Sequence, residues 1–109
     1  MAWTVEFLSE NVEDEFDELP LDMKAKFEQI AHLISEHGLR NVGMPYVRHL
    51  QDKLWEMRLK GRDGISRALY VTALEERVVV VRVFIKKTQK TPPREIRLAL
   101  KRAKEIEDE

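Results

Sequence analysis

The fold is decided by the stretch LWEMRLKGRDGISRALYVTA, which runs from Leu54 to Ala73. Apolar and charged residues alternate from Trp55 to Lys60, which is typical of a strand with one buried face. The glycines of Gly61–Gly64 supply turn chemistry, and Ser66–Ala73 then predicts the returning strand of a hairpin. The sequence therefore predicts an antiparallel pair at the centre of the chain.

The flanking segments extend this hairpin into a layered domain. After a turn at Glu75–Glu76, the nearly continuous apolar run Arg77–Lys87 predicts a third strand that is covered on both faces. Upstream, Trp3–Leu8 alternates like a short strand, and apolar residues at helical spacing follow it twice. The expected elements are a strand at 3–8, helices at 11–19 and 20–37 ending at Gly38, a loop at 41–52, the three strands, and a helix from Pro92–Pro93. This order indicates a single α+β domain over residues 1–109, with an antiparallel meander.

Composition excludes several classes of protein. The chain has 109 residues and no cysteine, so disulfides and thiolate chemistry are ruled out. The N-terminus lacks the basic start and apolar run of a secretory signal, and no segment approaches the roughly 20 apolar residues of a membrane span. We therefore expect a cytoplasmic protein without a membrane partner.

Charge is divided unevenly along the chain. Residues 1–39 carry two basic and ten acidic side chains, whereas residues 40–109 carry seventeen basic and ten acidic ones. The net charges are therefore −8 and +7, although the whole chain carries only −1. Such a basic half favours a polyanionic partner, and the alternative is a surface on which the two halves form salt bridges.

Three motifs resemble a known family. They are the Leu-Trp-Glu-x-Arg strand at Leu54–Arg58, Arg-x-x-Tyr at Arg67–Tyr70, and Phe-x-Lys-Lys-Thr-x-Lys-Thr-Pro from Phe84 to Pro92. Together with the order of elements, they resemble the phage-derived, HigB-like branch of the RelE/ParE toxin superfamily. The resemblance covers nearly the whole chain and is strongest from Leu54 to Lys104.

This resemblance implies a compact antiparallel sheet with two N-terminal helices packed on it and a C-terminal helix. It also implies the toxin of a type II toxin–antitoxin system, which enters the ribosome and cleaves messenger RNA. The expected partners are the ribosome, its messenger RNA and a cognate antitoxin with a helix-turn-helix domain. ParE-like members share the fold and instead inhibit DNA gyrase, and a non-toxic nucleic-acid-binding module is a third possibility.

Cleavage of RNA without a metal or other cofactor needs groups that accept and donate protons and cations that stabilise the phosphorane-like transition state. By motif position, Arg58 and Arg67 match the basic strand residues of the family's active site, and Lys87 falls near the basic residue that ends its last strand. Arg67 is the expected phosphate ligand, with Lys87 beside it. Arg58 and Lys60 are expected to transfer protons or position RNA. Glu56 is expected to act as a base or to orient Arg58; the alternative is an ion pair with Arg58 on a solvated face.

A second group of basic residues is expected to hold the RNA backbone. It comprises Lys86, Lys90, Arg94, Arg97 and Lys101. For the lysines the alternative is a solvated loop. No pair of histidines or carboxylates has convincing metal spacing, so no metal site is expected, and only His49 among the three histidines lies near the basic half.

Aromatic residues are scarce where the family uses them. Several ribosome-dependent members carry a tyrosine or histidine near the C-terminal helix, but neither an aromatic residue nor a histidine follows Phe84 here. Base stacking would have to come from Tyr46, Trp55 or the ribosome, because Tyr70 is expected in the core. This departure keeps a non-cleaving activity open.

Overall fold

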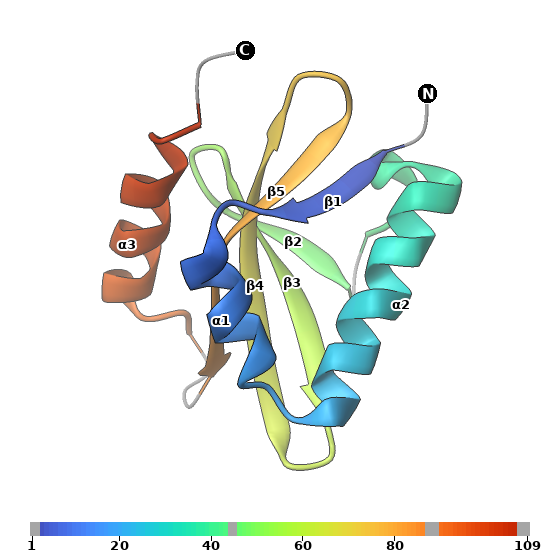
Figure 1. Ribbon diagram of the computed structural model, residues 1–109, viewed down its shortest axis with the longest axis vertical. Helices are drawn as coiled ribbons and strands as arrows, with labels where there is room; N and C mark the ends of the chain where they lie inside the picture. Colours follow the sequence, from blue (N-terminus) through green and yellow to red (C-terminus); the bar gives the residue numbers. More distant parts are fainter. Residues whose placement is uncertain (1–2, 44–45, 87–89, 107–109) are drawn as a thin grey trace.

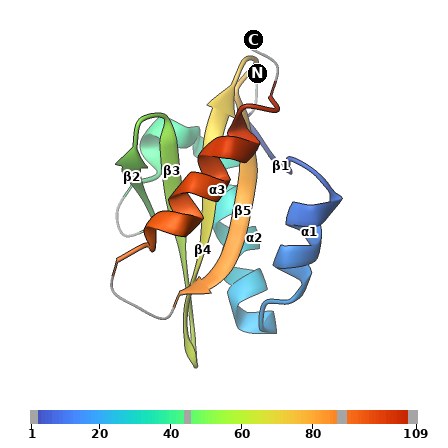
Figure 2. The same ribbon diagram turned by 90° about the vertical axis from the view of Figure 1, so that its left-hand side faces the viewer.

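Three layers form the domain in a computed structural model that describes residues 3–43, 46–86 and 90–106. Helices α1 (Glu10–Asp17) and α2 (Leu21–His37) cover one face of a sheet, and α3 (Pro93–Ala103) covers part of the other (Figures 1 and 2). The predicted α+β architecture, with two N-terminal helices and one C-terminal helix, is thereby confirmed.

The sheet of the described residues has five strands in the order β1-β5-β4-β3-β2. Their bounds are β1 Thr4–Phe7, β2 Val47–Gln51, β3 Leu54–Gly61, β4 Gly64–Ala73 and β5 Arg77–Lys86. The predicted hairpin and meander are β3, β4 and β5, which pair antiparallel. β1 lies parallel to β5, so the sheet is mixed.

The loop prediction for residues 41–52 is wrong over Val47–Gln51, where the chain forms β2. Only Val47 of this strand is buried, at 4% exposure, so the apolar alternation that marks a half-buried strand is weak here. β2 pairs with β3 at the sheet edge, and a register shift interrupts the pairing between His49 and Gln51. A 3₁₀ turn, η1 (Leu39–Asn41), precedes it.

Two apolar cores lie on opposite faces of the sheet, as the period of two along each strand requires. On the α1 and α2 face, Met57, Leu59 and the predicted core residue Tyr70 are completely buried. On the α3 face, the core is built around Leu69 and Ala99. Polar residues of β3 and β4 on the α3 face interrupt this apolar core. They are therefore the candidates for a functional site.

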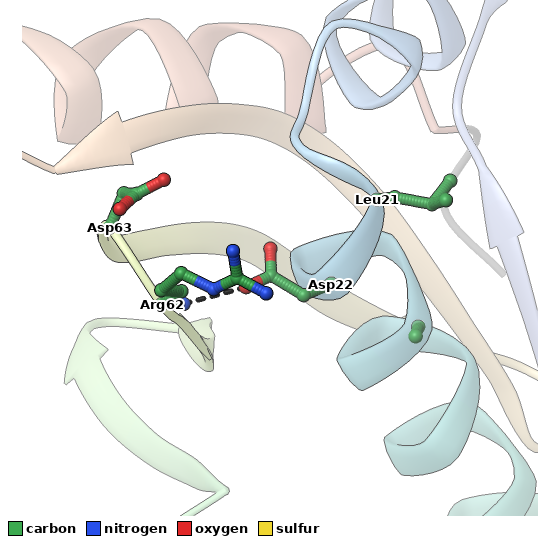
Figure 3. A pocket seen from close by; sticks show the side chains of 5 residues that line it. Leu21, Asp22, Arg62 and Asp63 are labelled. Carbon is green, nitrogen blue, oxygen red and sulfur yellow. Dashed lines mark hydrogen bonds between the residues drawn. The ribbon is translucent and has the colours of Figure 1, made fainter.

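The β3–β4 turn is anchored to the start of α2. The backbone N–H of Arg62 donates to Asp22 Oδ2 over 2.6 Å, and these residues line a shallow pocket of about 490 Å³ with Leu21 (Figure 3). A Cβ atom on Gly61 would lie 2.8 Å from Met23 Cγ, so any other residue there would force the side chains of Met23 and Asp22 to move. No helix in the described ranges is long and apolar enough to cross a bilayer.

Candidate nucleic-acid interface

Cross-strand register brings the predicted basic residues of the central strands onto one face. Arg58 on β3 lies directly opposite Arg67 on β4. In the next row of the same face, two residues closer to the β3–β4 turn, Ile65 lies between Lys60 and Lys86. Directly opposed residues in a sheet have Cβ atoms about 5 Å apart, so these four cations lie within two adjacent rows.

A single carboxylate is embedded among these cations. Glu56 is only 1% exposed, and its Oε1 lies 3.6 Å from Arg67 Nε. Its Oε2 lies 3.4 Å from Arg48 Nε on the neighbouring strand β2. The hydroxyl of Thr91 donates a hydrogen bond of 3.0 Å to Oε1. Glu56 therefore joins two strands and the segment that leads into α3.

Arg67 is the most deeply buried cation of the cluster, at 3% exposure. Burial lowers the pKa of its guanidinium, the charge of Glu56 opposes this, and Arg58 and Arg48 lower the pKa further. An arginine nevertheless stays charged in proteins. Within the part of the chain that the structure describes, its Nε and Nη1 have no hydrogen-bond acceptor. Two buried, charged donors thus lack a hydrogen-bond partner among the described residues.

Lys86 belongs electrostatically to the same cluster. Burial lowers the pKa of its ammonium most, and the charge of Arg67 lowers the pKa next, against a raising effect of Glu56. Arg48 and Arg58 add smaller lowering effects. The neighbouring Lys87, the lysine singled out for catalysis, lies outside the described residues.

The residues predicted to hold the RNA backbone lie mainly on and before α3 rather than in this cluster. Arg94, Arg97 and Lys101 are exposed on the helix, and Lys90 is exposed ahead of it. In Figure 2, α3 lies across the sheet and β2 and β3 emerge beside it. An open pocket of about 570 Å³ separates the end of β5 from the start of α3. Its lining is Phe84, Ile85, Lys90, Thr91, Pro92, Pro93, Arg94 and Glu95.

Two residues of the site carry no signal in the sequence. Arg48 lies on β2, where the sequence predicts a loop, and only the pairing of β2 with β3 places it opposite Glu56. Thr91 belongs to the Phe84–Pro92 motif, but no helical or strand periodicity in the sequence indicates that it lies near β3. Its contact with Glu56 spans 35 positions of the chain.

The candidate stacking residues lie away from the cluster. Tyr46 packs against the α2-side core, and Lys26 lies 5.9 Å from its ring centre. Trp55 is next to Glu56 on β3 and therefore points to the opposite face of the sheet. There its ring packs against that of His49, with the ring centres 5.1 Å apart. Across the described ranges, no three His, Cys, Asp or Glu side chains lie together as a metal site.

Solved structures with this fold are known. One is a mutant of the Escherichia coli toxin RelE in the free state, with two arginines replaced by alanine. It is 19% identical, with a TM-score of 0.62, over 94% of this chain and 98% of that one. Another is the archaeal RelE–RelB complex from Pyrococcus horikoshii, 15% identical with a TM-score of 0.55, over 78% of this chain and 96% of the other. These likenesses confirm the RelE-like fold.

The comparison of sequences identifies the family. Residues 14–104 match the model of the phage-derived Gp49-like proteins, which are also described by a domain of unknown function. The comparison with curated protein sequences gave no match. The match includes β2 to β5 and α3, and with them every described residue of the cationic cluster. The chain therefore belongs to the phage-derived Gp49-like family.

Proposed function

We propose that this protein is the toxin of a toxin–antitoxin pair and that it cleaves messenger RNA on the ribosome. One observation carries the proposal: Arg67 is buried, charged and has two donors without an acceptor in the described chain. A guanidinium in this state suits a phosphate, because its fork matches two phosphate oxygens. The RelE-like fold and the exposed basic side chains of α3 support the same assignment.

In this proposal, the ribose 2′-hydroxyl gives up its proton to solvent water as its oxygen attacks the adjacent phosphorus, and the bond from phosphorus to the 5′-oxygen breaks, which leaves a 2′,3′-cyclic phosphate. Arg67 and Arg58 stabilise the charge that develops on the phosphorane-like transition state. Lys86, whose pKa is lowered, protonates the departing 5′-oxygen. Lys60 positions the backbone, and Lys87 stays in the proposal on sequence grounds alone. Glu56 is ill placed as a base, since it is buried and already has three partners.

RNA would continue from the cluster along α3, over Lys90, Arg94, Arg97 and Lys101. A cognate antitoxin, for which the sequence favours a helix-turn-helix protein, would inhibit the toxin by covering this basic face. Action on ribosomes places the protein in the cytoplasm. The structural relative from Pyrococcus horikoshii was solved as a complex of RelE with RelB, which supports a protein partner for this fold.

The test is to map transcript ends after brief induction. Wild type should produce new ends within translated regions, and Arg67→Ala should reduce them about 100-fold or more. Arg67→Lys should also be impaired, because lysine keeps the charge and loses the fork. Arg40→Ala is the matched control, since Arg40 is exposed in η1, outside the cluster. Toxicity without any cleaved transcript would refute the nuclease assignment.

One observation favours inhibition of DNA gyrase as the second candidate. No aromatic residue follows Phe84, and Tyr46 and Trp55 lie on the face opposite the cluster. A gyrase inhibitor would not need a stacking residue. Supercoiling by purified gyrase in the presence of the protein decides between the two, because a messenger RNA nuclease leaves supercoiling unchanged.

A further inference from the structure

Two side chains approach one oxygen atom, Oε1 of Glu56. Thr91 Oγ1 donates to it over 3.0 Å, whereas Arg67 Nε stands 3.6 Å away. The shorter separation is a hydrogen bond and the longer one is not. Oε1 therefore accepts a hydrogen bond from the hydroxyl of Thr91 and not from the guanidinium of Arg67.

The second oxygen of this carboxylate also has a partner. Oε2 lies 3.4 Å from Arg48 Nε. Arg48 is half-exposed, whereas Arg67 is buried and Thr91 is partly buried. A carboxylate that is held at both oxygens stays close to Arg67 without forming the fork-to-fork pair that arginine and carboxylate usually adopt.

This arrangement has a cost that an anionic ligand would remove. Buried charged donors are normally hydrogen-bonded, because an unpaired one loses its hydration without compensation. Arg67 Nε and Nη1 lack an acceptor in the described chain although a carboxylate oxygen lies 3.6 Å away. The site thus keeps a counter-ion nearby and leaves the donors unused.

We propose that Thr91 is a positioning residue: its hydroxyl occupies Glu56 Oε1 and so keeps the Arg67 guanidinium open for a phosphate oxyanion. Glu56 is then the internal counter-ion of the site rather than its base. Without the hydroxyl, the guanidinium closes onto Glu56, and its donors are lost to the ligand. The identification of that ligand as RNA phosphate rests on the proposed function, whereas the positioning role concerns phosphate as a chemical group.

The experiment follows the Arg67 Nε–H signal by nuclear magnetic resonance while inorganic phosphate is added to the full-length protein. In wild type the signal shifts with phosphate. Thr91→Val keeps the shape of the side chain and removes the donor, so it should bind phosphate about tenfold more weakly, the loss expected for a charge-assisted hydrogen bond. Its Nε–H signal should already be displaced before phosphate is added. Thr91→Ser keeps the hydroxyl and should bind within about twofold of wild type.

A double-mutant cycle tests the route through Glu56. In a Glu56→Gln background, Thr91→Val should cause no further loss of phosphate affinity, because the carboxylate that captures Arg67 is gone. Thermal unfolding checks that each variant is folded, and Thr91→Ala, which also lacks the hydroxyl, replaces Thr91→Val if that variant is not.

Two results would overturn the positioning role: a wild-type Arg67 signal that ignores phosphate, or Thr91→Val binding phosphate as tightly as wild type. Neither result depends on ribosomes. A protein that binds phosphate in this Thr91-dependent way and cleaves no transcript would refute the proposed function alone.

Discussion

Glu56 is one carboxylate among several cations that influence one another. The pKa of Lys86 responds to Arg67, Arg48 and Arg58 as well as to Glu56, so all five groups share one electrostatic environment. A buried charge that loses its only counter-ion is strongly destabilised. Glu56 therefore stabilises a site that would otherwise repel itself, and its removal should affect folding as well as activity.

The lowered pKa of Lys86 predicts a pH dependence. Burial, Arg67 and the other arginines disfavour its charged form, so its proton is lost at a lower pH than that of an ordinary lysine. If Lys86 protonates the leaving group, cleavage should decline as the pH rises through this lowered value. The arginine in Lys86→Arg stays charged over this range. The rate of this variant should therefore not decline at alkaline pH, even if its maximal rate is lower than that of wild type.

The measurement is the single-turnover cleavage rate between about pH 7 and about pH 10, a range that lies just below the ordinary lysine pKa of about 10.4. Lys53→Arg is the matched control, because Lys53 is exposed in the turn between β2 and β3. An unchanged alkaline decline in Lys86→Arg would show that another group donates the proton.

Strand periodicity predicts part of this site, and the rest depends on how the strands pair with one another. Alternation along β3 was enough to place Glu56, Arg58 and Lys60 on one face. It could not show that Arg67 lies opposite Arg58, because a slip of one residue would turn Arg67 to the other face. The contact of Thr91 with Glu56 depends on where the chain returns after β5, which no local pattern encodes.

At the scale of elements, α3 is tied to α1 across the edge of the sheet. Arg82 on β5 lies between Glu15 on α1 and Glu95 on α3, with N–O distances of 2.8 and 2.6 Å. Arg102 of α3 reaches Glu15 at 2.9 Å and donates to the carbonyl of Val81 over 2.9 Å. Glu15 also accepts a hydrogen bond of 3.1 Å from the backbone N–H of Val83. Val83 lies beyond the part of β5 that pairs with β1.

This network predicts that Glu15 stabilises the attachment of α3. Burial raises the pKa of its carboxyl, but the hydrogen bonds from Arg102 and Val83 and the charges of both arginines outweigh burial and leave the pKa below 4.5. The stabilisation is therefore complete above the ordinary pKa and is lost as the pH falls through the lowered, folded-state value. Glu15→Gln should reduce the free energy of unfolding by about 1–2 kcal/mol at neutral pH, less than for a fully buried pair because Glu15 is partly exposed.

Urea unfolding at neutral and acidic pH measures this difference. Asp14→Asn is the control, since Asp14 is exposed on the same helix. The gap between wild type and Glu15→Gln should close as the pH falls below 4.5, the ordinary carboxyl value. A gap that persists in acid would show that Glu15 acts through packing rather than through its charge.

Among the elements, the helices and the meander could be predicted from periodicity, whereas β2 could not. The apolar stripes of α1 and α2 contain residues such as Val12 and Ile30 that are completely buried, so their pattern is strong. β2 has the edge of the sheet on one side and exposes three of its five residues. An edge strand of this kind is defined by its partner β3 more than by its own sequence.

At the scale of the whole molecule, the unequal charge of the two halves becomes a separation of layers. The acidic half forms α1 and α2 on one face of the sheet, and α3 on the other face exposes Arg94, Arg97 and Lys101. Some charges do pair between the halves: Arg77 with Glu6, and Arg82 and Arg102 with Glu15. The exposed cations of α3 lie outside these pairs, so salt bridges account for part of the charge pattern and the polyanionic partner stays a prediction.

The layer of exposed cations predicts how RNA affinity responds to salt. Each phosphate contact to single-stranded RNA contributes about −0.7 to the slope of log affinity against log salt concentration, because a bound counterion is released. If Arg97 and Lys101 each contact one phosphate, Arg97→Gln with Lys101→Gln should reduce the magnitude of the slope by about 1.4. The control is Lys24→Gln with Arg40→Gln, which removes the same charge from the α2 side. Fluorescence anisotropy of a labelled RNA between about 50 and about 200 mM salt measures the slopes. Equal slopes for the two double variants would mean that net charge, and not the α3 surface, governs RNA binding.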